Sequence, residues 1–113
     1  MQVIFESRDD DGAQLRDLSV ERVRFALRRL TNWVPRAKVL FSDVNGPRGG
    51  VDKRCQVELS TEAAGTVVIA SLARDWRTAL DRSLGRATRV LTRSLQRSQK
   101  PSRGRTAKLA FDS

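Results

Sequence analysis

The sequence contains no histidine and no tyrosine, and it has a single cysteine among its 113 residues. Histidine is a principal residue for proton transfer in enzymes and for zinc ligation, so both chemistries lose a main contributor. One cysteine cannot close a disulfide within the chain. Cys55 falls on the same side of its predicted strand as the apolar residues Val57 and Leu59, which favours a packed thiol over a nucleophile. These absences argue against an enzyme, and we expect no catalytic residues, no metal and no other cofactor.

Long apolar runs are absent as well, since none approaches the roughly 20 residues that a bilayer-spanning helix needs. The apolar start of the chain is short and runs into Glu6 and three consecutive aspartates, unlike an export signal. The length suits a single hydrophobic core. We therefore expect a cytoplasmic protein without membrane contact, with one domain over residues 1–98 and a basic, flexible tail over 99–113, where the apolar periodicity stops.

Acidic residues are few compared with basic ones. There are 13 acidic against 22 basic residues, which gives a net charge of +9, and 18 of the basic residues are arginine. The arginine side chain is a planar fork of donors that matches phosphate and stacks on bases, so this bias favours a nucleic-acid partner. Codon usage in a GC-rich genome enriches arginine too, and composition alone leaves that explanation open.

Four segments are predicted to be strands, the first three because they alternate apolar and polar residues and the fourth because it is rich in residues that favour strands. They cover residues 2–6, 37–44, about 54–59 and 66–72. The last two are separated by a break at Ala64-Gly65 and predict a hairpin. The acidic segment 8–12 predicts a turn or loop. Its aspartates lack the downstream ligand that a calcium loop requires, so we expect them to be solvated.

Two segments have a helical period instead. The first helix is predicted over 20–34, with Asp17 or Ser19 as its N-cap and Pro35 at its end. The second starts at an Asp75 N-cap and runs to about Arg97. Six apolar residues share one face of it: Trp76, Leu80, Leu84, Ala87, Leu91 and Leu95.

These elements follow one another in the order β-α-β-β-β-α. Each helix and each strand has one apolar face, so they can bury one another if both helices cover the same side of a four-stranded sheet. The predicted fold class is α+β, a two-layer sandwich. Gly85 lowers the helix propensity of the second helix by about 1 kcal/mol, which its length and periodicity outweigh.

The second helix has a row of arginines opposite its apolar face, which we call the basic stripe. On a helical wheel its members fall within about 80° of one another and span roughly 22 Å along the axis. They are Arg82, Arg86, Arg89, Arg93 and Arg97. A charged outer face often serves only solubility, but such faces usually mix signs, because like charges at i,i+4 repel. The single sign of this stripe favours an anionic partner.

The first helix adds further basic residues, and two of them are candidate contacts: Arg28, which points outward, and Arg29. Phe25 is also predicted to point outward, where it could stack on a base, touch a partner protein or simply be exposed. The loop Arg48-Gly49-Gly50, followed by Lys53 and Arg54, could bring backbone amides close to phosphate. It lacks the pattern of a nucleotide-binding loop, which favours a plain turn between two strands.

The element order and several local motifs resemble the short form of the bacterial ribosome hibernation promoting factors, which include the ribosome-associated inhibitor proteins and are also described as the sigma-54 modulation protein family. The resemblance covers about residues 1–98. It rests on the first strand Met1-Gln2-Val3-Ile4, on Arg28-Arg29-Leu30, on the connection from Asn45-Gly46-Pro47 to Asp52-Lys53-Arg54-Cys55, and on Ala73-Arg74-Asp75-Trp76 leading into Ala79-Leu80-Asp81.

The resemblance implies a sandwich similar to a double-stranded-RNA-binding domain. It also implies a translation inhibitor that binds the small ribosomal subunit in the channel for messenger and transfer RNA during stationary phase or stress. The expected partner is then the 30S or 70S ribosome through 16S rRNA, with no small-molecule substrate and a monomer off the ribosome. The implied rRNA contacts are Arg82, Arg86, Arg89, Arg93, Arg28, Arg29, Lys53 and Arg54, and Arg97 extends the same stripe.

The sequence departs from the long form of this family, because the second domain through which long-form members dimerise does not follow the tail. Pairing of ribosomes by this chain alone is therefore left open. Two other functions also stay open. One is a regulatory protein-interaction module of the sigma-factor modulator type, using Phe25 and the exposed sheet face. The other is a generic RNA-binding protein, which would bind naked duplexes as tightly as ribosomes.

Overall fold

The computed structural model describes residues 1–44, 53–99, 103–104 and 106–107. The predicted loop Arg48-Gly49-Gly50 and most of the predicted tail 99–113 lie outside the described residues. The strands are β1 (Gln2–Ser7), β2 (Arg36–Asp43), β3 (Lys53–Ser60), β4 (Thr66–Ala73), β5 (Arg103–Gly104) and β6 (Thr106–Ala107). The helices are α1 (Asp10–Ala13), α2 (Arg16–Ala26) and α3 (Trp76–Gln99).

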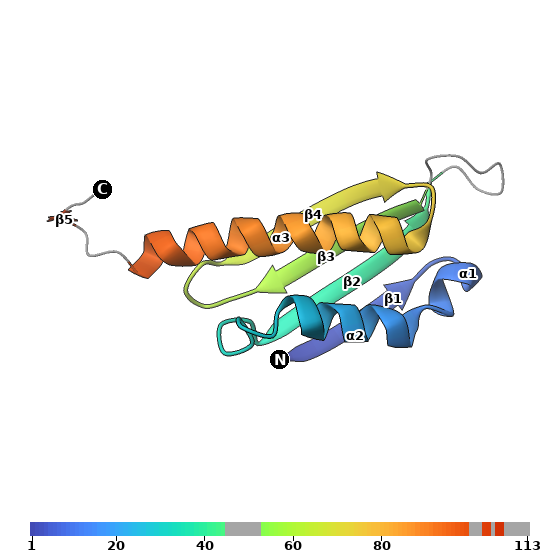
Figure 1. The fold of residues 1–113 in the computed structure, drawn as a ribbon, viewed down its shortest axis with the longest axis horizontal. Helices are drawn as coiled ribbons and strands as arrows, with labels where there is room; N and C mark the ends of the chain where they lie inside the picture. Colours follow the sequence, from blue (N-terminus) through green and yellow to red (C-terminus); the bar gives the residue numbers. More distant parts are fainter. Residues whose placement is uncertain (45–52, 100–102, 105, 108–113) are drawn as a thin grey trace.

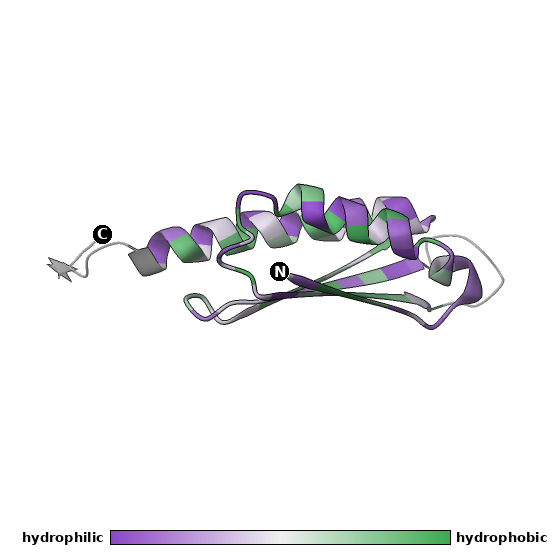
Figure 2. Cartoon of the chain, turned by 90° about the horizontal axis from the view of Figure 1, so that it is seen from below, coloured by the Kyte–Doolittle hydropathy of each residue, from purple (hydrophilic) through white to green (hydrophobic). Residues whose placement is uncertain are grey.

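The four long strands form one sheet in the order β1-β2-β3-β4. β1 pairs with β2 in parallel, whereas β2 with β3 and β3 with β4 are antiparallel, which confirms the predicted hairpin. The two long helices lie on the same face of the sheet and leave the other face open (Figures 1 and 2). The predicted α+β two-layer sandwich is therefore confirmed, and each boundary of the four long strands lies within one residue of its prediction.

The core lies between the sheet and the helices. Alternate residues of β2 and β3 point toward the helices and are fully buried: Ala37, Val39, Phe41, Cys55, Val57 and Leu59. α3 packs across β3 and β4, while α2 packs on β1. At one end of the core the Phe41 ring stacks on Trp76 at 4.7 Å and meets the edge of Phe5 at 5.1 Å. Such aromatic pairs add to the free energy gained by burial alone.

The expectation of a turn or loop at 8–12 is wrong, because residues Asp10–Ala13 form the short helix α1. Asp9 caps this helix, its carboxylate accepting a hydrogen bond from the backbone N–H of Asp11 at 2.9 Å. Gly12 is buried against the core, and a Cβ at this position would lie 2.6 Å from Ser7 Oγ and 3.0 Å from the Phe41 ring. Only glycine lets the α1 backbone come this close to the sheet.

The bounds and caps predicted for the first helix are also wrong. α2 begins after Leu15, which caps it without a side-chain hydrogen bond, and Ser19 is buried within it. α2 ends at Ala26, and the chain continues through turns in which each bond joins residues three apart, such as Leu30 N–H to Leu27 C=O at 2.8 Å. These tight turns keep Leu27 and Val34 fully buried at a helix-like spacing. The apolar period in the sequence therefore extends beyond the end of the helix.

The prediction for α3 is confirmed. Asp75 Oδ1 accepts a hydrogen bond from the Thr78 backbone N–H at 2.8 Å, and Oδ2 accepts one from the Thr78 hydroxyl at 2.9 Å. These hydrogen bonds hold the pKa of Asp75 below its ordinary value, because they favour the ionised carboxylate. All six residues of the predicted apolar face are buried. No helix among the described residues is long and apolar enough to cross a bilayer.

Candidate functional site

The basic stripe lies on the exposed side of α3, and all five of its arginines are exposed to solvent. Two of them have partners within the chain. Arg82 donates to the Leu72 carbonyl of β4 at 3.1 Å, and Arg97 donates to the Ser94 hydroxyl at 3.3 Å. The other three, Arg86, Arg89 and Arg93, make no hydrogen bond or ion pair with any described residue.

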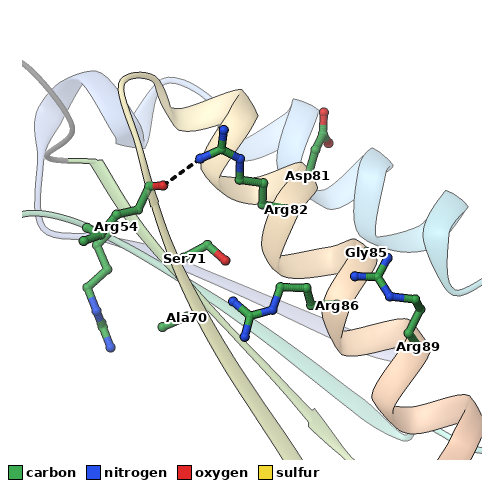
Figure 3. Close-up of a pocket in the computed structure, with 9 residues that line it drawn as sticks. Arg54, Ala70, Ser71, Asp81, Arg82, Gly85, Arg86 and Arg89 are labelled. Atoms are coloured by element: carbon green, nitrogen blue, oxygen red, sulfur yellow. Dashed lines mark hydrogen bonds between the residues drawn. The ribbon is translucent and has the colours of Figure 1, made fainter.

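A groove of about 650 Å³ runs between α3 and β4, and the first half of the basic stripe forms one of its walls (Figure 3). Its opposite wall is the Ala70–Leu72 segment of β4. Because β4 is the last strand of the sheet, the outer edge of its backbone is not paired with another strand of that sheet. The remaining lining residues are Arg54, Asp81, Arg82, Gly85, Arg86 and Arg89. The groove therefore combines several guanidinium groups with an open strand edge.

The single acidic residue of α3, Asp81, lies beside the basic stripe. Arg22 of α2 forms an ion pair with it, in which the single nitrogen Nη1 donates to both carboxylate oxygens at 2.9 and 3.0 Å. A paired carboxylate repels a bound anion less than an isolated one does. This contact joins α2 to α3 and compensates the negative charge nearest the groove.

The two basic candidates at the end of α2, Arg28 and Arg29, lie just beyond the helix rather than within it. The Arg28 guanidinium sits 4.2 Å above the centre of the Phe25 ring and donates to the Phe25 carbonyl at 2.8 Å. Phe25 is 67% exposed, which confirms that it points outward. Arg29 is exposed, and its side chain makes no hydrogen bond or ion pair with the described residues. One face of the Phe25 ring is thus already covered by an arginine.

The remaining two candidates, Lys53 and Arg54, are brought to opposite faces of the sheet because they are consecutive residues of β3. Lys53 lies on the helix-covered face, where its ammonium pairs with Asp43 at 2.7 Å and sits 5.5 Å from the centre of the Trp76 ring. Arg54 lies on the open face and donates to Gln56 at 3.0 Å. Only Arg54 of the two also lines the groove.

Cys55 is fully buried under α3, as the alternation predicted. Burial raises the pKa of its thiol to about 12, because desolvation disfavours the thiolate more than the nearby Ser83 hydroxyl and Arg54 stabilise it. A thiol in this state is a packing residue rather than a nucleophile. The described part of the chain holds no cluster of three or more metal-ligating side chains of the histidine, cysteine or carboxylate types.

No protein-family model matches this sequence, and no curated protein sequence matches it. Solved structures do match, among them two bacterial proteins. A ribosomal subunit interface protein from Coxiella burnetii is 14% identical, with a TM-score of 0.64, and the match covers 82% of this chain and 96% of that one. The N-terminal domain of Thermus thermophilus Protein Y is 22% identical, with a TM-score of 0.53, over 85% of this chain and 98% of that one.

This chain shares the fold of both proteins. The resemblance predicted from the sequence is therefore confirmed at the level of fold, over nearly the whole of each neighbour.

Sequence analysis missed two parts of the groove. The β4 wall could not be found, because nothing in the residues Ala70–Leu72 says that their strand lies at the edge of the sheet beside α3. Gly85 was noted only as a residue unfavourable to a helix, although it lies within the groove among the arginines. Its position within the basic stripe was the available signal.

Proposed function

We propose that this protein is a ribosome-associated, non-enzymatic translation inhibitor that acts in the cytoplasm. In this proposal, residues 1–98 bind the rRNA of the small subunit in the channel for messenger and transfer RNA, in stationary phase or under stress. The observation that carries it is the basic stripe, in which Arg86, Arg89 and Arg93 have no partner among the described residues. The shared fold supports it, because one neighbour is described as a ribosomal subunit interface protein.

In the proposed mechanism the domain blocks the channel by its bulk, and the arginines bind phosphates without reading sequence. The basic stripe, with Arg28, Arg29 and Arg54, supplies the positive surface. Lys53 contributes less in this proposal, because Asp43 already compensates its charge. Binding that depends on phosphate contacts should weaken steeply as the salt concentration rises.

Sedimentation of the protein with isolated 30S subunits and 70S ribosomes tests the proposal. The wild-type protein should sediment with ribosomes at low salt, and the variant Arg86→Glu/Arg89→Glu/Arg93→Glu should remain unbound. A matched control, Arg8→Glu/Arg36→Glu/Arg74→Glu, changes net charge equally at exposed positions outside the basic stripe and should still bind. Absence of the wild-type protein from the ribosomal fractions would overturn the proposal.

A regulatory protein-interaction module is the second candidate function, and exposed apolar residues favour it. Phe25 is 67% exposed, and Val68 and Leu72 are 53% and 44% exposed on the open sheet face. This function predicts that the wild-type protein and the triple glutamate variant bind ribosomes equally well, or that neither of them binds. It also predicts that Phe25→Ala loses binding to a protein partner. A generic RNA-binding protein would instead bind a naked RNA duplex as tightly as it binds ribosomes.

A further inference from the structure

Gly85 occupies the interior of α3, where glycine costs about 1 kcal/mol relative to alanine. Nothing in the described structure requires a glycine there. Gly65 alone among the described glycines has a positive φ, so the Gly85 backbone suits any residue. A Cβ added at Gly85 would meet only Arg89 Nη1, at an ordinary contact distance of 3.7 Å. Neither backbone conformation nor internal packing therefore explains this residue.

Gly85 lies where two grooves meet on the surface of α3, a position that it shares with Asp81. It lines the groove between α3 and β4, and it also lines a second groove between α2 and α3. Arg82 and Arg89 lie about one turn before and after it, and Arg86 is its neighbour. In the close-up the Arg89 guanidinium extends toward Gly85 (Figure 3). The half-buried position at Gly85 is thus bare only in lacking a side chain, and Arg82, Arg86 and Arg89 flank it along the helix.

We infer that the bare surface at Gly85 is the seat of one backbone phosphate of bound RNA, held by Arg86 and Arg89. This inference rests on the proposed function and adds to it the point at which the RNA strand comes closest to the protein. Glycine is the residue used where another backbone must approach closely, and a side chain at this position would push the strand outward. The Arg22 pair with Asp81 keeps the nearest carboxylate compensated, so the seat is not opposed by an isolated negative charge.

The arrangement favours an RNA strand over an acidic protein segment. The basic stripe continues past the groove at regular one-turn intervals and spans roughly 22 Å, as a repeating chain of phosphates would require. An acidic peptide needs no such repeat of one charge sign and usually adds apolar anchors. The groove wall contributes few apolar side chains for such anchors, chiefly Ala70 and Leu72.

Two substitutions test the seat: Gly85→Ala, which adds one carbon, and Gly85→Gln, which adds a long neutral side chain. Both residues favour helices more than glycine does, so both variants should unfold at higher temperature than wild type. Their affinity for isolated 30S subunits should nevertheless fall, by about tenfold for Gly85→Gln, the loss of about one phosphate contact. The slope of log affinity against log salt should fall by about 0.7–0.9 for the same reason.

Thr92→Ala is the matched control. It lies on an exposed part of the same helix and also raises helix propensity, but it removes atoms from the surface instead of adding them. The Thr92→Ala variant should unfold at a higher temperature than wild type and bind 30S subunits equally well. Gly85→Gln binding 30S subunits as tightly as wild type would overturn the seat, and if the triple glutamate variant still fails to bind, the proposed function survives. The seat would also be overturned if Gly85→Gln lost binding to polyglutamate but kept binding to 30S subunits, because the occupant of the seat would then be an acidic polypeptide.

Discussion

The arginines of α2 and of α3 differ in what they contact. Arg16 and Arg22 of α2 engage the Phe5 carbonyl and the Asp81 carboxylate, and Arg28 just after the helix covers the Phe25 ring. In α3, by contrast, Arg86, Arg89 and Arg93 contact no described polar group. Composition treats these arginines alike, whereas the structure separates those that hold the fold together from those that face solvent.

The difference shows which surface needs an external explanation. Like charges three or four residues apart on a helix repel by a few tenths of a kcal/mol per pair, and the basic stripe contains four successive pairs of this kind. Among the arginines of α2, Arg22 has an acidic partner, Asp81, that offsets such repulsion. For the basic stripe of α3 an anionic ligand would do so, and for this reason we propose α3 as the binding surface.

The largest expected effects concern the buried faces of α2 and α3, which should contribute equally to the stability of the core. Leu80 in α3 and Leu27 at the end of α2 are both fully buried. Each of Leu80→Ala and Leu27→Ala should lower the free energy of unfolding by about 2–5 kcal/mol, because each leaves a cavity in the core. Urea denaturation measures both values. A cost below about 1 kcal/mol for either residue would show that its region is not part of the common core.

The next effect separates the two outer surfaces. The variant Arg86→Ala/Arg89→Ala/Arg93→Ala should weaken binding to 30S subunits by about a hundredfold and lower the salt slope by about 2–3. Alanine at Arg24, Arg28 and Arg29 should lower the slope by no more than about one, since Arg28 is already held on Phe25. Binding measured from 50 to 200 mM salt gives both slopes. Equal slopes for the two variants would remove the distinction between the surfaces.

The sequence predicted the sheet and α3 well because their patterns are long and regular. The alternation in β2 and β3 and the strand-favouring residues of β4 placed each boundary within one residue, and the apolar face of α3 was predicted correctly throughout. The bounds of α2 were predicted wrongly because the turns that follow the helix, such as the one between Leu27 and Leu30, continue its apolar spacing. α1 was missed because one helical turn has no period to detect.

The candidate site was predictable only in part. The basic stripe follows from the α3 period alone, since residues on one helix keep fixed angles to one another. Whether an arginine has an internal partner depends on contacts between distant segments, such as Arg22 with Asp81. Lys53 and Arg54 point to opposite faces of the sheet because β3 begins at Lys53, one residue before the predicted strand. The groove required the strand order, which places β4 at the edge.

A smaller effect concerns the contact that joins the two helices. Asp81→Asn removes the single acidic residue of α3 and releases Arg22. Both changes make the surface more positive, so binding to 30S subunits should tighten by roughly threefold at low salt. Because the pair is largely exposed, the free energy of unfolding should fall by less than about 1 kcal/mol. Weaker binding by this variant would mean that the Arg22–Asp81 pair itself positions the RNA.

The smallest effect compares how the two helices begin, since Asp75 caps α3 by its side chain whereas Leu15 caps α2 without one. The folded state lowers the pKa of Asp75 below its ordinary value of 3.8, first through the hydrogen bond from the Thr78 backbone. A lowered folded pKa gives stability that is present above the unfolded pKa and is lost as the pH falls through the folded one. Thermal unfolding should therefore show Asp75→Ala less stable than wild type at neutral pH, with the gap narrowing below pH 3.8. Asp75→Asn keeps an accepting oxygen but does not titrate, so it should rescue most of the loss at neutral pH. A gap between wild type and Asp75→Ala that stays constant down to acid pH would show that the carboxylate charge plays no part in starting α3.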